Sequence, residues 1–194
     1  TGSYARQAIT LDVSKSVTGL TWIDNNLWIA EDANNQILKG SIPHGVTVTT
    51  DPLDLAAQGT STVWVLLDGT PNDVVLEMYG GFSTSSSWFV RRQFDAPTAD
   101  SGAITYRAST ERYYVGKDNK VFEISKTNSV ARQVIELTAG SEVTGLTFVD
   151  NNLWIAEDSN NQILKGSIPH GVTITQDPLD LAAQGTSTVW VLLD

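Results

Sequence analysis

Residues 18–68 read TGLTWIDNNLWIAEDANNQILKGSIPHGVTVTTDPLDLAAQGTSTVWVLLD, and residues 144–194 read TGLTFVDNNLWIAEDSNNQILKGSIPHGVTITQDPLDLAAQGTSTVWVLLD. The two stretches differ at five positions, and nearly all the changes conserve size or polarity. The match extends weakly toward the amino end, because ARQ at residues 5–7 returns at residues 131–133. Residues 5–68 therefore repeat as residues 131–194, at an offset of 126. A fixed internal period of this kind predicts a repeat fold.

A shorter period lies inside the 126-residue unit. Three runs, beginning at residues 27, 63 and 112, each combine an apolar and aromatic stretch, a turn rich in Asp, Asn or Gly, and a second alternating stretch. This is the pattern of a β-hairpin. Aligning Trp28, Trp64, Tyr113 and Trp154 gives intervals of 36, 49 and 41 residues, with a mean of 42. Hairpins that recur every 40 to 45 residues or so, without helical periodicity, are typical of propeller blades.

Each hairpin has room for one strand before it and one after it. In the first unit the expected strands are residues 17–22, 27–31, 36–41 and 45–49, and the outermost strands of the next two units are residues 87–94 and 130–137. Residues 51–59, DPLDLAAQG, carry the Asp-Pro start and Gly end of a short helical turn. The alignment of the units instead predicts an innermost strand at the same place, so both interpretations stay open.

The fold class predicted from these observations is all-β. It is a β-propeller, or a portion of one, built as a single repeat domain over residues 1–194 from four-stranded antiparallel blades of about 42 residues. The chain starts with an outer strand at residues 7–11 and stops inside a repeat. Three arrangements stay open: five blades with a composite closing blade in which residues 7–11 pair beside residues 188–193, part of a six-bladed ring, or pairing of the unmatched ends between molecules.

Composition narrows the classes of partner. The formal net charge is −10 and the pI about 4.5, which argues against binding to nucleic acid. There is no cysteine, so no disulfide or thiolate metal site is available. No stretch approaches the roughly 18 consecutive apolar residues of a transmembrane helix, so we expect no membrane insertion.

At the strings GLTWIDNNLWIAEDANNQILKGS and GLTFVDNNLWIAEDSNNQILKGS the chain resembles blades of the NHL, YWTD and gluconolactonase-like propellers. The resemblance covers the two related blades, about half of the chain, and the other blades only by pattern. The His-Arg pair that often follows Asn in NHL blades is Asn-Gln here, and LWIAED stands in place of YWTD. The resemblance implies a scaffold and does not imply a particular chemistry.

Acidic residues end the second strand of several units. They could form a ring at one mouth of the propeller and bind Ca²⁺ through oxygen ligands, although Lys117 interrupts the set. The alternative is that each Asp accepts backbone N–H groups of its own turn. The candidate metal ligands are Asp32, Asp68, Asp158 and Asp194.

Aromatic residues and histidines give weaker functional signals. The aromatic residue that recurs once per unit is expected to pack between neighbouring sheets, and no cofactor site is predicted. His44 and His170 fall in the phrase SIPHGVT, which we interpret as an exposed turn. Trp88 lies beside Arg91 and Arg92 on an expected outer strand, and these three residues are the candidate surface contact.

The function that fits these observations is a non-enzymatic propeller scaffold. It would act as a structural or binding module, extracellular or on the surface of a particle, and self-associate through its incomplete terminal blades. A protein or glycan ligand is compatible with this function. The alternatives are a metal-dependent hydrolase like the gluconolactonases and a carbohydrate-binding lectin. No Gly-x-Ser-x-Gly, HExxH or phosphate-binding glycine motif supports an enzyme.

Overall fold

The computed structural model describes residues 16–194 except residues 24, 41, 81–88, 98, 126–130 and 187; for residues 42–47 and 168–173 it describes the backbone only. All the regular secondary structure among these residues is β-strand, in the eighteen strands β1 to β18. No helix that could cross a membrane is present in the part of the chain that the structure describes.

The strands form four antiparallel sheets of four strands and one sheet of two strands. The first sheet holds β1 (Val17–Ile23), β2 (Asn26–Glu31), β3 (Gln36–Lys39) and β4 (Ile42–Thr47). The second holds β5 (Pro52–Gln58), β6 (Thr62–Leu67), β7 (Val74–Tyr79) and β8 (Phe89–Asp95). The third holds β9 (Ala103–Arg107), β10 (Arg112–Lys117), β11 (Lys120–Ser125) and β12 (Ala131–Glu136). The fourth holds β13 (Val143–Val149), β14 (Asn152–Glu157), β15 (Gln162–Lys165) and β16 (Ile168–Thr173), and the fifth holds β17 (Pro178–Gln184) and β18 (Thr188–Leu193).

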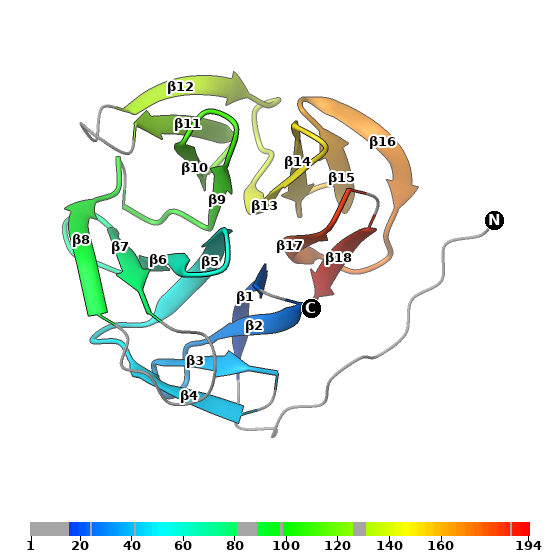
Figure 1. Cartoon of the computed structure of the whole chain (residues 1–194). Helices are drawn as coiled ribbons and strands as arrows, with labels where there is room; N and C mark the ends of the chain where they lie inside the picture. Colours follow the sequence, from blue (N-terminus) through cyan, green and yellow to red (C-terminus); the bar gives the residue numbers. More distant parts are fainter. Residues whose placement is uncertain are drawn as a thin grey trace.

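The five sheets stand around one axis, each with its first strand innermost (Figure 1). The backbone N–H of Leu20 in β1 donates to the carboxylate of Asp180 in β17, which joins the first sheet to the fifth. The structure therefore confirms the predicted β-propeller, and the five sheets close the ring without a sixth. The predicted strand at residues 7–11 lies outside the described residues.

Two local predictions are decided by the backbone. Residues 52–58 form strand β5, so the helical turn is wrong and the inner strand is confirmed. The predicted turn at SIPHGVT is also wrong, because residues 42–47 form β4 and residues 168–173 form β16. The pairing of β4 with β3 shifts register between Pro43 and Val46, so His44 lies within the strand at an irregularity of the pairing.

Asparagine makes the tight turns that the sequence predicted. Asn25 and Asn151, between the first two strands of their blades, have φ angles of 59° and 60°. Asn35 and Asn161, at the turns before β3 and β15, have φ angles of 51° and 52°. Asparagine tolerates this left-handed conformation better than most residues, which explains its recurrence here.

The hydrophobic core lies between neighbouring blades, and one aromatic residue per blade fills much of it. Trp28, Trp64 and Tyr113 are fully buried, which confirms their predicted packing role. The ring of Trp64 stacks on that of Tyr113 with centroids 5.2 Å apart, and these two come from adjacent blades. Trp154 occupies the equivalent place in the fourth blade but is only partly buried.

Candidate functional site

The four candidate metal ligands lie at the ends of second strands, as predicted. The backbone N–H of Asp32 donates to Ser16 and that of Asp158 to Glu142, at 3.1 and 3.2 Å. The carbonyl oxygens of Asp32 and Asp158 accept the N–H of Asn35 and Asn161 in their own turns. The remaining two, Asp68 and Asp194, donate their backbone N–H groups to Asp51 and Asp177.

Ser16 and Glu142 line a cavity of about 270 Å³, which places Asp32 and Asp158 beside one mouth of the ring. The same cavity is lined by Asp100 and Asp118. Burial and the charges of Asp158 and Asp118 raise the pKa of Glu142. In the described ranges no three His, Asp or Glu side chains are grouped to hold a metal ion.

Lys117, which the sequence placed in the ring of acids, lies near the same mouth. Its ammonium group donates to the carbonyl oxygen of Ala99 and is 3.9 Å from the carboxylate of Asp100. Part of the negative charge at this mouth is thus balanced by a cation from the third blade.

The glutamates that precede Asp32 and Asp158 have a structural role. Glu31 and Glu157 are buried, and the side-chain amides of Asn34 and Asn160 donate to both oxygens of the respective carboxylate, at 3.0–3.2 Å. A buried carboxylate needs such partners because burial otherwise disfavours its charge. The repeated ED-x-N pattern is therefore explained by the turn it builds.

The sequence analysis did not predict a role for a pair of buried aspartates near the ring axis. The carboxyl groups of Asp54 in β5 and Asp180 in β17 lie close enough to affect each other's ionisation. Asp54 also accepts the N–H of Leu55 and of Ile104 in β9, both at 2.6 Å. Asp180 accepts the N–H of Leu181 at 2.6 Å and the N–H of Leu20 in β1. Each carboxyl group thus fastens its own blade to the next one.

Burial is the main reason that the pKa values of both aspartates lie well above the usual range for the residue. The charge of Asp180 raises the pKa of Asp54 further. Two carboxyl groups that share a buried site cannot both ionise readily. The pair therefore retains a proton to a higher pH than an exposed aspartate does.

Glycine makes room for this pair. A Cβ atom at Gly19 would lie 2.5 Å from Cα of Asp54, and one at Gly145 would lie 2.5 Å from Cα of Asp180. Both positions belong to the innermost strands that precede the aspartate strands around the ring. The Gly-Leu-Thr and Leu-Asp-Leu strings, each present twice, were the signal in the sequence that could have revealed this packing.

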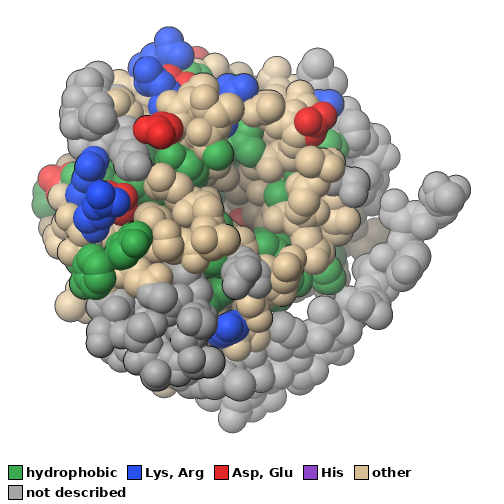
Figure 2. Space-filling model, in the orientation of Figure 1, with side chains coloured by type: hydrophobic (Ala, Val, Ile, Leu, Met, Phe, Trp, Pro, Cys, Tyr) green, Lys and Arg blue, Asp and Glu red, His purple; other side chains and the backbone are tan. Residues whose placement is uncertain are grey.

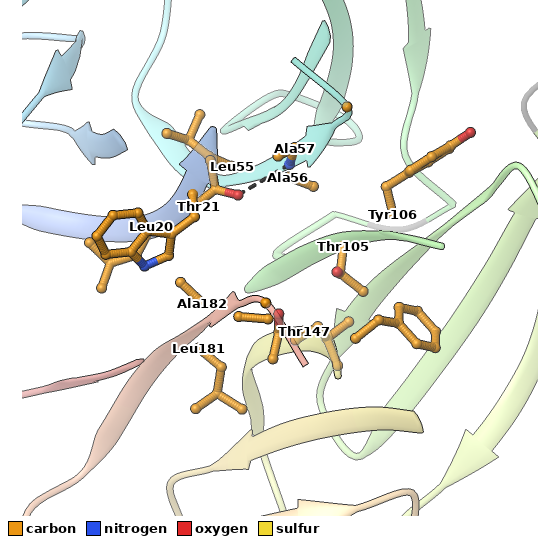
Figure 3. Close-up of a pocket in the computed structure, with 16 residues that line it drawn as sticks. Leu20, Thr21, Leu55, Ala56, Ala57, Thr105, Tyr106, Thr147, Leu181 and Ala182 are labelled. Atoms are coloured by element: carbon orange, nitrogen blue, oxygen red, sulfur yellow. Dashed lines mark hydrogen bonds between the residues drawn. The ribbon is translucent and has the colours of Figure 1, made fainter. Parts of the chain in front are cut away.

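A second cavity of about 280 Å³ lies at the other end of the axis, where all five innermost strands contribute residues (Figure 3). Thr21, Thr105 and Thr147 line it, and each is at least nine-tenths buried. The hydroxyl of Thr21 accepts the backbone N–H of Ala57 at 3.1 Å. Figure 3 shows Thr21, Thr105 and Thr147 around the cavity, while Tyr106 points away from it.

The predicted surface contact lies on the outer part of the second blade. Trp88 is outside the described residues, but Arg91 and Arg92 lie on β8 and are 53% and 39% exposed at the side chain. Both are ion-paired to the buried Glu77 of β7, with N–O distances of 3.6 and 3.2 Å. Next to them Tyr79, Phe89 and Val90 are exposed, with Tyr79 and Phe89 in ring contact at 5.3 Å. Figure 2 shows basic and hydrophobic side chains side by side at this edge of the ring.

Comparison with known proteins supports the fold. No family model matches the chain, and no curated protein matches it. Among solved structures it is similar to a chain from the crystal structure of a nidogen/laminin complex, with a TM-score of 0.65. That likeness covers 93% of this chain and 73% of the other chain, at 14% sequence identity. The likeness shows a β-propeller fold.

Proposed function

We propose that this chain is a non-enzymatic propeller scaffold, extracellular or on a particle surface, that self-associates through its incomplete fifth blade. We further propose that it is related to the NHL and YWTD group whose blades it resembles. The observation that carries the proposal is the open outer edge of β18. In the part of the chain that the structure describes, β18 pairs with β17 alone, whereas every other second strand has a partner on both sides.

An open strand edge of this kind favours association. The six residues of β18 are exposed or half-buried, and their backbone groups on the outer side can pair with a further strand. The same six residues in β6 are all buried, because β7 and β8 extend that sheet. The sequence of β18 is therefore suited to a strand with a neighbour on each side, as β6 is.

Residues 7–11 are the segment that we propose as the further strand of the fifth blade. The segment ARQAITL at residues 5–11 resembles ARQVIEL at residues 131–137, and residues 131–136 form the outermost strand β12. We propose that residues 7–11 of a second copy complete the fifth blade. In this arrangement one molecule donates residues 7–11, and the β17–β18 hairpin of its neighbour receives them as a further strand.

The molar mass in solution tests the proposal. We expect the full chain to be dimeric or larger by light scattering, with a mass that rises with concentration, and a chain lacking residues 1–12 to be monomeric. Because the protein has no cysteine, introduced cysteines can form disulfides only with each other. Chains carrying only Ile9→Cys, mixed with chains carrying only Val191→Cys, should give a covalent heterodimer under oxidising conditions. A monomeric full chain that forms only an internal disulfide in the double variant would overturn exchange between copies.

A protein-binding role for the second blade is favoured by a separate observation. Tyr79, Phe89 and Val90 expose apolar surface beside two arginines, a composition that protein interfaces often show. We propose that this surface, with Trp88, binds a protein. Phe89→Ser together with Arg91→Ala should abolish capture of that protein while leaving the molar mass in solution, and so the self-association, unchanged. Capture that survives both substitutions would place the contact elsewhere.

A further inference from the structure

We propose that the axial cavity of about 280 Å³ binds one small, neutral, polyhydroxylated molecule the size of a monosaccharide. The cavity is lined by Thr21, Thr105 and Thr147 with aromatic residues Trp22, Tyr106 and Phe148. This site goes beyond the scaffold function and is independent of it, since it lies on the axis and the proposed association uses the outer edge of the fifth blade.

The first support is that five strand edges converge on the axis. The innermost strands β1, β5, β9, β13 and β17 are each an end strand of their sheet, so one edge of each has no neighbouring strand in that sheet. Backbone groups on such an edge need partners. Near the middle of the axis Asp54 and Asp180 satisfy the N–H groups of Ile104 and Leu20. At the cavity, a ligand with many hydroxyl groups can act as the partner.

The second support is the chemistry of the side chains. Three threonine hydroxyls offer both donors and acceptors in a nearly buried position. The indole Nε1 of Trp22, which also lines the cavity, is buried and has no hydrogen-bond partner among the described residues. A buried donor without a partner is destabilising unless water or a ligand completes it.

Charge and size then select the ligand. No charged side chain lines the cavity, so a carboxylate, phosphate or amine would be buried without a counter-charge, which is strongly unfavourable. The volume is just below the range of about 300 to 1,000 Å³ that is usual for drug-sized ligands, so the cavity suits a single ring.

Titration of the purified chain with neutral monosaccharides tests the site. Calorimetry with glucose, galactose, mannose and N-acetylglucosamine should show saturable binding of at least one of them at one molecule per chain. Glucuronate and glucosamine, which carry charge, should bind at least tenfold more weakly. Retention on immobilised glycans distinguishes a terminal sugar from a free one, because only an accessible terminal residue would be retained.

Matched variants connect the binding to the cavity. Thr105→Val and Thr147→Val keep the shape and remove one hydroxyl each, and each should weaken binding about tenfold. Trp22→Phe introduces the residue that the other repeat carries at position 148, and it should weaken binding about fivefold by removing the indole N–H. The control Thr49→Val changes an exposed threonine in the loop before β5 and should have no effect.

The thermal midpoint of each variant establishes that it is folded. If none of the neutral sugars binds saturably, the proposal is wrong. It is also wrong if the charged sugars bind as tightly as the neutral ones, or if the cavity variants bind like the control. Loss of this binding would leave the self-association intact, so the two proposals fail separately.

Discussion

Residues 51–68 and 177–194 have the same 18-residue sequence, DPLDLAAQGTSTVWVLLD, and the two copies differ in burial. The inner strands β5 and β17 show the same burial pattern at all seven positions. The second strands diverge, since β6 is buried throughout and β18 is buried nowhere. Local sequence therefore determines the hairpin, whereas the neighbouring strands and blades determine how much of it is covered.

The tryptophans of these hairpins show the divergence most clearly. Trp64 and Trp190 both donate their indole N–H to a glutamine of their own hairpin, at 2.9 and 3.1 Å. Trp64 is fully buried among Tyr106, Tyr113 and Phe94 of the second and third blades. Trp190 has one aromatic neighbour among the described residues, Trp22 of the first blade, at 5.5 Å.

The largest difference between the copies should come from shortening this tryptophan. Trp64→Ala is expected to lower the free energy of unfolding by about 3 to 5 kcal/mol, because it leaves a cavity in a close-packed core. Trp190→Ala should lower it by roughly 1 to 2 kcal/mol, because the side chain is partly exposed. Urea unfolding of dilute protein measures both. Equal losses would show that the open edge of β18 is covered by another strand.

The buried aspartates should respond alike in the two copies. Asp54→Ala leaves the N–H groups of Leu55 and Ile104 without their acceptor, and Asp180→Ala does the same to Leu181 and Leu20. Each substitution should lower the free energy of unfolding by about 2 to 4 kcal/mol, since an unsatisfied buried donor costs about 1 to 3 kcal/mol. The control Asp95→Ala lies at the exposed end of β8 and should change little. A small effect at Asp180 alone would mean that the ring closes without this bond.

The glycines that face these aspartates should give the next effect. Gly19→Ala and Gly145→Ala each place a methyl group against the backbone of an aspartate strand. We expect each to lower the thermal stability, at a cost of about 1 to 3 kcal/mol, typical of overpacking. Gly102→Ala is the milder comparison, because its Cβ would be 3.0 Å from the nearest atom. If Gly145→Ala is tolerated and Gly19→Ala is not, the fifth blade, which Gly145 faces, can shift to make room more easily than the second blade, which Gly19 faces.

The smallest effect should appear in the pH dependence of stability. The folded pKa values of Asp54 and Asp180 are raised above the unfolded value of 3.8, so the contribution of the pair to stability is fully present below that pH. It is lost as the pH rises toward the raised folded pKa. Asp54→Asn or Asp180→Asn removes one of the two like charges. Either substitution should therefore reduce the loss of stability with rising pH, and the two should do so to the same extent. Unfolding curves between pH 3 and 8 measure it, and an unchanged slope would contradict a shared proton.

The sequence predicted the features that depend on neighbours along the chain. Hairpins, turns at Asn25 and Asn35, and the buried aromatic residue of the first three blades all follow from local pattern, and the structure confirms them. The period of about 42 residues then predicted a propeller, because such hairpins can bury their faces only by stacking.

Features that depend on the closed ring could not be predicted in this way. Asp54 and Asp180 sit in DPLDLAAQG, a string that also suggests a helical turn, and their partners come from other blades. The pairing of Arg91 and Arg92 with Glu77 depends on the register between β7 and β8. Thr105 and Thr147, which both line the axial cavity, are 42 residues apart in the chain and come together only when the ring forms.

The bonds made by the two axial aspartates have a consequence for how such rings can be assembled. Asp54 is followed around the axis by a blade whose inner strand starts Ala-Ile-Thr, and Asp180 by a blade whose inner strand starts Val-Thr-Gly, yet each carboxyl group accepts a main-chain N–H of the blade that follows. A main-chain donor is present whatever the side chain. This hydrogen bond therefore sets no requirement on the side chain at the donating blade, and the same aspartate can join its blade to blades of different sequence.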